Sequence, residues 1–153
     1  MADPQLDEID REILSLLQEN ARYPNAAISD RLSVSASTVG KRLKHLEESG
    51  VIRGYRPLID YERIGFSLQV LFVCTVGLAD RRASVQPLLE LPGVVCVREL
   101  MTGQHNLHVT VVGRDRAAIT AVAERITDLG VDIDEETLLR DERFRPSNVF
   151  ERD

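Results

Sequence analysis

The chain has 153 residues, of which 43% are hydrophobic and 29% are charged. This composition is typical of a globular protein and excludes a disordered one, and no apolar stretch approaches the roughly 20 residues of a membrane-spanning helix. Acidic side chains outnumber basic ones by 25 to 19, for a formal net charge of −6, and an acidic chain argues against nucleic-acid binding.

The N-terminal residues MADPQ have neither the basic start nor the apolar core of a secretory signal. Two cysteines, Cys74 and Cys96, are too few for a disulfide framework, and we expect them to be small buried side chains rather than a redox switch. His105 and His108 would point to opposite faces of a strand, which argues against a shared metal ion. We therefore expect a cytoplasmic protein without a metal site, a cofactor or a catalytic group.

Two helices are expected before residue 33. Asp7 is a good N-cap for the first helix, and the apolar residues after it recur on one helical stripe: Ile9, Ile13, Leu16 and Leu17. Pro24 has a ring that presets the backbone of a first helical turn, and it begins a second helix of about two turns. The residues Ser33-Val34-Ser35 then form a tight connection.

A third helix is expected from the N-cap Ser35 to about Ser49, with Gly50 as its C-cap. A two-turn helix, a tight turn and a longer helix match helix-turn-helix geometry. A simple three-helix core is the alternative, and it explains the apolar positions. It does not explain the outer face of the third helix, where small and hydroxyl residues precede both lysines of the chain: Ala36, Ser37, Thr38, Lys41, Arg42, Lys44 and His45.

This outer face predicts contact with DNA. The short side chains at the start of the helix approach bases or phosphates, and the longer ones reach phosphates or guanine edges. Two arginines that follow the helix are expected to contact the flanking DNA backbone. The predicted DNA-binding set is Ser35, Ser37, Thr38, Lys41, Arg42, Lys44, His45, Arg53 and Arg56.

The charges are unevenly distributed along the chain. From Arg31 to Arg56 there are six basic and two acidic side chains, a local charge of +4, which leaves −10 for the rest. A small basic face on an acidic body fits DNA contacted through that face alone, although most charge clusters are simply solvated helix faces. The excess of acids and arginines over lysines also suits a salt-rich cytoplasm, where screening shortens the repulsion between acidic groups and DNA.

The second part of the chain has a different periodicity. Residues 53–65 are expected to form a linker, with a short strand from Ile52 to Leu58. From Phe66 alternation predicts a first strand, followed by a helix over 82–91, strands over 94–101 and 107–112, a helix between Asp115 and Gly130, and a strand over 131–139. The acidic run at 132–136 is more typical of a solvated strand edge than of a cation site.

This β-α-β-β-α-β order predicts a ferredoxin-like arrangement with two helices on one face of an antiparallel sheet. We therefore expect an α+β protein with a helix-turn-helix domain at residues 1–52, the linker at 53–65 and a ferredoxin-like domain at 66–153. Leu71 and Val73 would form an exposed apolar patch on the other face, so a homodimer that buries this face is expected. A dimer also presents two recognition helices to a palindromic DNA site.

Four motifs, in this order and spacing, resemble the Lrp/AsnC (feast/famine) family of prokaryotic transcription regulators. They are LDEIDREILSLLQENAR at 6–22, SVSASTVGKRLKHLEESGVIRGY at 33–55, IDYERIG at 59–65 and LMTGQHNLHV at 100–109. The resemblance covers the chain from about Leu6 to Leu139. It implies a winged or three-helix helix-turn-helix, a ferredoxin-like effector domain (RAM domain) and nucleoid-associated dimers that often assemble into octamers. Some family members bind amino acids at contacts between dimers.

The chain departs from the family pattern at three places. Ser33 and Ser29 replace a usual glycine and a usual alanine in the helix-turn-helix. The effector turn usually reads Thr-Gly-x-Tyr-Asp-Leu, and Asn106 here replaces an aspartate that would pair with an ammonium group. We predict effector contacts from the whole turn, and the alternatives are a dimer–dimer contact or a hairpin turn that needs Gly103. The predicted effector-binding residues are Thr102, Gly103, Gln104, His105 and Asn106.

The sequence therefore predicts a sequence-specific DNA-binding transcriptional regulator, not an enzyme, that acts as a dimer or higher oligomer. An amino acid or another small molecule bound between dimers is its expected effector. One alternative is an enzyme resembling siroheme decarboxylases, which share this architecture, but the lysine-bearing third helix argues against it. The other is a chromatin-organising protein, which would bind random and promoter DNA equally well.

Overall fold

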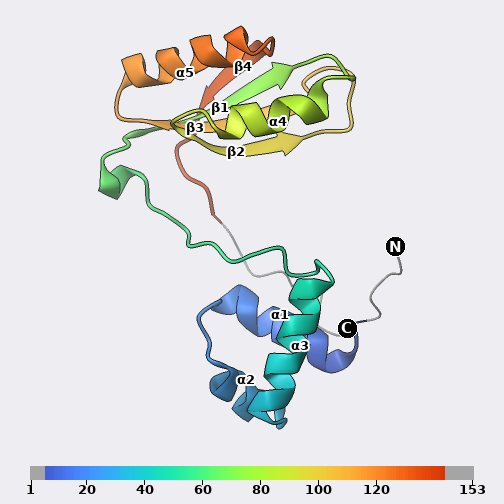
Figure 1. Ribbon diagram of the computed structural model, residues 1–153. Coiled ribbons are helices and arrows are strands. Elements are labelled where there is room, and N and C mark those ends of the chain that lie inside the picture. The colour runs from blue at the N-terminus through green and yellow to red at the C-terminus, as the bar shows by residue number, and fades with distance from the viewer. Residues whose placement is uncertain (1–5, 144–153) are drawn as a thin grey trace. The chain divides into compact units, whose positions relative to one another are not determined.

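The computed structural model describes residues 6–143 of the chain (Figure 1). The described residues divide into two compact units, one of residues 6–58 together with Arg143 and one that spans Ile59–Glu142, and each is considered by itself. Residues 1–5 and 144–153, which belong to the outer ends of the two expected domains, lie outside the described residues. Within 6–143, no helix is both long and apolar enough to cross a membrane.

The first unit consists of the three expected helices, α1 (Glu8–Glu19), α2 (Asn25–Leu32) and α3 (Ala36–Glu48). Their core is a set of buried side chains contributed by all three helices: Ile13, Leu14, Ile28, Val39 and Leu46. No strand occurs between residues 6 and 67, so the described part of this unit is a three-helix form without the strands of a wing.

The connection between α2 and α3 is tight because Ser33 adopts the left-handed backbone conformation, with φ of 54° and ψ of 36°. Two residues later the Ser35 side chain caps α3 by accepting a hydrogen bond from the Thr38 N–H at 3.0 Å. At the other end of α2, Pro24 has an extended ψ of 153° and is the residue before the helix, one position earlier than its ring suggested.

The strand expected at Ile52–Leu58 is wrong. Residues 53–60 form no regular secondary structure, and the linker contains one short 3-10 helix, η1 (Glu62–Ile64). A strand needs a hydrogen-bonded neighbour, and alternation in a sequence does not supply one. Tyr55 instead donates a hydrogen bond to Glu47 of α3 at 2.9 Å, which fixes the start of the linker to the third helix.

The second unit confirms the ferredoxin-like prediction. Its elements are β1 (Leu68–Thr75), α4 (Arg81–Leu89), β2 (Val94–Glu99), β3 (Leu107–Gly113), α5 (Arg116–Asp128) and β4 (Asp132–Leu138). The strands are antiparallel and lie in the order β2-β3-β1-β4. The observed bounds differ from the expected ones by one or two residues at most ends.

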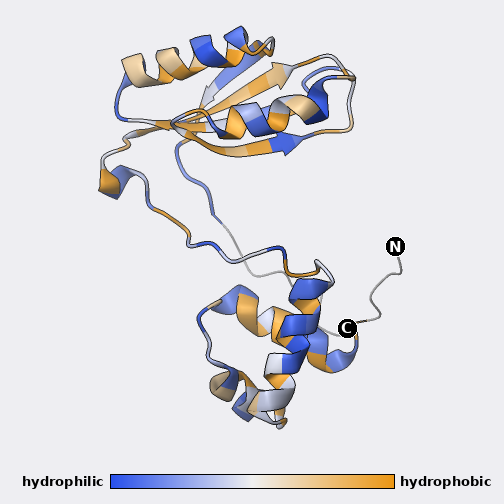
Figure 2. Cartoon of the chain, viewed as in Figure 1, coloured by the Kyte–Doolittle hydropathy of each residue, from blue (hydrophilic) through white to orange (hydrophobic). Residues whose placement is uncertain are grey.

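Both helices of this unit lie on the same side of the sheet (Figure 1). Val70, Phe72 and Cys74 of β1 point to that side and are buried with residues of α4 and α5. Figure 2 shows the hydrophobic colours concentrated in β1, β2 and β3, whereas β4 is largely hydrophilic. The core therefore lies between the central strands and the two helices.

The opposite face of the sheet carries the alternate residues of β1, including Leu71 and Val73, both half-buried. After β4, Glu142 pairs with Arg98 of β2 at 3.4 Å. Leu71 and Val73 are only half-buried, so part of this apolar face remains accessible.

Candidate DNA-binding surface and effector turn

One side of α3 faces solvent and carries polar and cationic residues at i, i+4 and i+7 spacing, which places them on one helical face. We call this set the exposed stripe: Ser37, Thr38, Lys41, Lys44 and His45, of which Thr38 is partly buried. On the other side of the helix, Val39 and Leu46 are fully buried. The core thus fixes which side of α3 remains available to a partner.

The start of α3 is organised by hydroxyl groups. Ser35 Oγ lies 2.9 Å from Ser37 Oγ and 2.7 Å from Thr38 Oγ1, in addition to accepting the capping bond from the Thr38 N–H. Ser35 therefore has a structural role as a cap. Ser37 and Thr38 lie in the first turn of the helix and are the hydroxyls that the stripe presents.

Gly40 allows a close approach between α3 and α2. A Cβ atom at this position would lie 3.1 Å from Nδ2 of Asn25, the first residue of α2. The two helices of the motif therefore meet at a site without a side chain, and the exposed stripe is left uncovered by α2.

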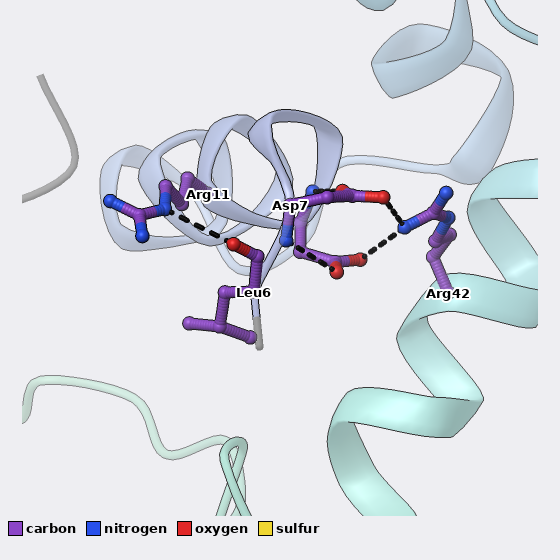
Figure 3. A network of polar contacts seen from close by, with 5 residues as sticks. Leu6, Asp7, Arg11 and Arg42 are labelled. Carbon is purple, nitrogen blue, oxygen red and sulfur yellow. Dashed lines mark hydrogen bonds and ion pairs between the residues drawn. The ribbon is translucent and has the colours of Figure 1, made fainter. Parts of the chain in front are cut away.

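Arg42 departs from its expected outward position. Figure 3 shows its guanidinium directed toward the first turn of α1, where Nη1 donates to Asp7 Oδ2 and, at 3.1 Å, to Asp10 Oδ1. The backbone N–H of Asp10, followed by Arg42, lowers the pKa of Asp7 against an opposing effect of burial. The hydrogen bonds that Arg42 donates to Asp7 and Asp10 correspondingly raise the pKa of Arg42.

The other cations near α3 differ in their surroundings. Arg31 lies 4.5 Å from the Tyr23 ring centroid and 3.7 Å from Glu19, so its charge is partly compensated. Arg53 and Arg56 are exposed in the segment after α3. Because Arg31 and Arg42 both pair with carboxylates of α1 and its N-cap, the available positive surface is smaller than the sequence suggested.

The expected effector turn is held by Asn106, which is fully buried. Its amide accepts from the Val76 N–H at 3.0 Å and donates to the Val76 carbonyl at 2.8 Å. Both polar atoms of the side chain are therefore occupied by backbone, and Asn106 faces the protein rather than solvent. Of the five predicted effector residues, Thr102, Gly103, Gln104 and His105 are exposed.

His105 joins the turn to two neighbouring strands. It has a left-handed φ of 51°, its N–H donates to Thr75 Oγ1 at 2.8 Å, and Thr75 donates to Asp134 Oδ2 at 2.6 Å. The His105 ring nitrogen Nε2 lies 4.0 Å from the same Asp134 oxygen. A carboxylate therefore stands beside the turn, although it comes from β4 and not from the motif itself.

Three side chains of these two sites were not singled out from the sequence. Asp10 is three residues after Asp7, and this spacing fits a reciprocal capping box. The spacing could therefore have indicated that Asp10 helps to cap α1. Thr75 and Asp134 are brought beside the turn by strand pairing. The sequence marked Asp134 only as part of the acidic run at 132–136, which it predicted to be a solvated strand edge. Within residues 6–143, no group of three or more candidate ligands could hold a metal ion.

Cys74 is buried in the sheet, and burial together with nearby Asp134 raises the pKa of its thiol to about 12. A thiol that stays protonated at neutral pH is a poor nucleophile. Cys96 on β2 is partly buried.

Comparisons with known proteins agree with this geometry. A family model described as winged helix-turn-helix DNA-binding matches residues 6–53. An HTH-type transcriptional regulator of Pyrococcus abyssi is 40% identical over 111 residues, which are 72% of this chain and 70% of that protein. The HTH-type transcriptional regulator LrpA of Pyrococcus horikoshii is 35% identical over 113 residues, 72% of this chain and 77% of the relative.

The similarity extends to solved structures. A transcriptional regulator from Neisseria meningitidis, crystallised in complex with L-methionine, aligns with a TM-score of 0.76 and 26% sequence identity. The alignment covers 95% of this chain and 96% of that one. Both units of the described structure therefore have counterparts in a single known protein.

Proposed function

The chain belongs to the Lrp/AsnC family of helix-turn-helix transcriptional regulators, and we propose that it binds DNA through the exposed stripe of α3. The observation that carries this assignment is the placement of both lysines of the chain on the solvent side of a helix whose other side is buried. Ser37 and Thr38 approach the base edges, and Lys41 and Lys44 neutralise phosphates.

The neighbourhood of the stripe favours this role. Lys44 lies 3.6 Å from Glu48, an exposed pair whose partners are both more than half accessible. Such a pair contributes little free energy, so phosphate competes with Glu48 without a large cost. Arg53 and Arg56, beyond the end of α3, supply charge for the flanking DNA backbone.

Lys41→Met tests this surface. Wild-type protein first selects a duplex from a random library, and its affinity for that duplex is then measured over a range of salt concentrations. Loss of one phosphate contact in each protomer, two in the proposed dimer, is expected to weaken binding and to make the slope of log K against log salt shallower by about 1.8. Arg116→Met, an exposed cation of α5, serves as the control and leaves both quantities unchanged. An unaltered slope for Lys41→Met would remove α3 from the interface.

We propose that the DNA-binding form is a homodimer in which the open faces of two sheets meet. Leu71 and Val73 supply the apolar surface, and pairing two copies removes it from water. Family resemblance extends this assembly to dimers of dimers, up to an octamer.

Val73→Arg tests the dimer by placing a charge in the interface. Sedimentation is expected to show a monomer at concentrations where wild-type protein is dimeric, because the interface would have to remove the new guanidinium from water. Leu89→Arg alters an exposed apolar residue of α4, outside the open face, and is expected to leave the dimer intact. A Val73→Arg protein that sediments like wild type argues for another interface.

We propose that an amino acid or a related small molecule bound at the turn 102–105 modulates this regulator. The complex of the Neisseria meningitidis relative with L-methionine supports the ligand class. His105 and Asp134 lie beside the turn and supply polar contacts, since Asn106, at the family's aspartate position, is buried against Val76. The proposal is tested by calorimetric titration with L-methionine and the other proteinogenic amino acids, with sedimentation measured in parallel. If no amino acid gives a heat of binding and none alters the assembly, the proposed effector site is contradicted.

We propose further that regulation by this chain involves no catalysis and takes place on the cytoplasmic nucleoid. The curated relatives, both named transcriptional regulators, support this view. Tetrapyrrole absorbance in the purified protein together with no DNA binding favours the enzyme alternative instead.

A further inference from the structure

Three side chains form a closed network between α1 and α3. Asp7 Oδ1 accepts from the Asp10 N–H at 3.0 Å and Asp10 Oδ2 accepts from the Asp7 N–H at 3.3 Å, so the two residues make a reciprocal capping box. The other oxygen of each carboxylate accepts from Arg42 Nη1 (Figure 3). All four carboxylate oxygens therefore have a donor, and one guanidinium nitrogen closes the network.

The network is well placed to fix an angle between helices. Asp10 is nearly buried, with 7% of its side chain exposed, whereas Arg42 is 32% exposed. A buried carboxylate is stable only while it is paired, so Arg42 has little freedom to leave it. Arg42 belongs to the helix that bears the exposed stripe, and the two carboxylates belong to the N-cap and first turn of α1.

We propose that Arg42 is a positioning residue for DNA recognition, which holds α3 against the start of α1 through Asp7 and Asp10 and makes no phosphate contact of its own. This inference rests on the proposed function, in which the exposed stripe of α3 binds DNA. It changes the role of Arg42 from a cation that binds phosphate to a support for the cations that do.

Electrostatics makes the two roles distinguishable. Two carboxylates around one guanidinium give the cluster a net negative charge, which repels phosphate. If charge alone governed binding, Asp10→Asn would strengthen DNA binding, both by removing that charge and by releasing Arg42. If Arg42 positions α3, Asp10→Asn weakens sequence-specific binding, because the buried anchor of the network is lost.

The experiment compares Arg42→Met, Asp10→Asn and Lys41→Met on two duplexes, the one selected by the wild-type protein and a shuffled duplex of equal length. Arg42→Met and Asp10→Asn are each expected to lower the preference for the selected duplex by about tenfold, the cost of a mismatched base pair. Their salt slopes stay at the wild-type value. Lys41→Met removes two phosphate contacts per dimer, so it makes the slope shallower by about 1.8 on both duplexes and leaves the preference nearly unchanged.

Folding is controlled by measuring all proteins well below the melting temperature of the least stable variant, as judged by circular dichroism. Loss of stability alone does not alter a preference measured on folded protein. Arg42→Lys, which keeps the charge but loses the planar fork, is expected to restore part of the preference. If Arg42→Met does not fold, Asp10→Asn and Arg42→Lys carry the test.

Two results overturn the proposal. In the first, Arg42→Met makes the salt slope shallower by as much as Lys41→Met does and leaves the preference for the selected duplex intact. In the second, Asp10→Asn binds both duplexes more tightly than the wild-type protein. Failure of the underlying function has a different signature, because then the wild-type protein selects no duplex or Lys41→Met has no effect on the slope.

Discussion

Among single residues, Asn106 shows how a motif position takes on a packing role. Its amide bonds both the N–H and the carbonyl of Val76, in a place where no solvent reaches the side chain. An amide carries both donor and acceptor groups and matches a peptide group that offers the complementary pair, whereas a carboxylate offers acceptors alone. The asparagine therefore suits the backbone that it contacts.

Asn106→Asp is expected to destabilise the protein by about 2–3 kcal/mol, since it leaves the Val76 carbonyl without a donor and buries a charge. Urea denaturation at neutral pH measures the change. Gln104→Glu makes the same chemical replacement at an exposed position of the same turn and is expected to have little effect. Equal stability of the Asn106→Asp variant and the wild-type protein would mean that the new carboxylate finds another donor.

Among the helices and their connections, the helix-turn-helix depends on a turn that tolerates a serine. Ser33 holds a left-handed conformation at a position where the family pattern has glycine, and an L-residue there costs about 1–2 kcal/mol relative to its favoured region. The bond from the Thr38 N–H to the Ser35 side chain starts α3 immediately afterwards. The spacing of α2 and α3 is thus maintained at some cost in free energy.

Ser33→Gly is expected to stabilise the protein by about 0.5–1 kcal/mol, because the relief of strain exceeds the added freedom of the unfolded glycine. Thermal denaturation measures it. Ser37→Gly provides the matched control, since Ser37 lies inside α3, where glycine lowers stability. A melting temperature that falls in both variants contradicts the assignment of strain to Ser33.

Over the molecule as a whole, charge is divided between the two units. Residues 6–58 hold eight basic and eight acidic side chains, whereas residues 59–142 hold eight basic and 14 acidic ones. The helical unit is therefore neutral overall and presents its lysines on one face, and the sheet unit carries the net negative charge. The net negative charge of the chain therefore does not argue against DNA binding by the helical unit.

DNA affinity is expected to change little, or to pass through a maximum, as potassium chloride rises from low to molar concentration. Salt weakens the lysine–phosphate contacts, but it also screens the repulsion between DNA and the acidic sheet unit. Fluorescence anisotropy with the selected duplex measures the affinity. A steep and monotonic loss rules out adaptation to a salt-rich interior and leaves an ordinary regulator whose affinity depends mainly on phosphate contacts.

Local sequence was enough to predict the helices, the strands of the sheet, the α+β fold and the family, because caps and apolar periodicity act between residues close in the chain. Both lysines on the outer face of α3 also followed from helical spacing. Long-range contacts in the folded chain were needed to set the direction of Arg42, whose partners Asp7 and Asp10 lie 35 and 32 residues away. The burial of Asn106 and the lack of a strand in the linker also depend on the fold. In both cases the deciding contact is with residues distant in the sequence, which a local pattern does not indicate.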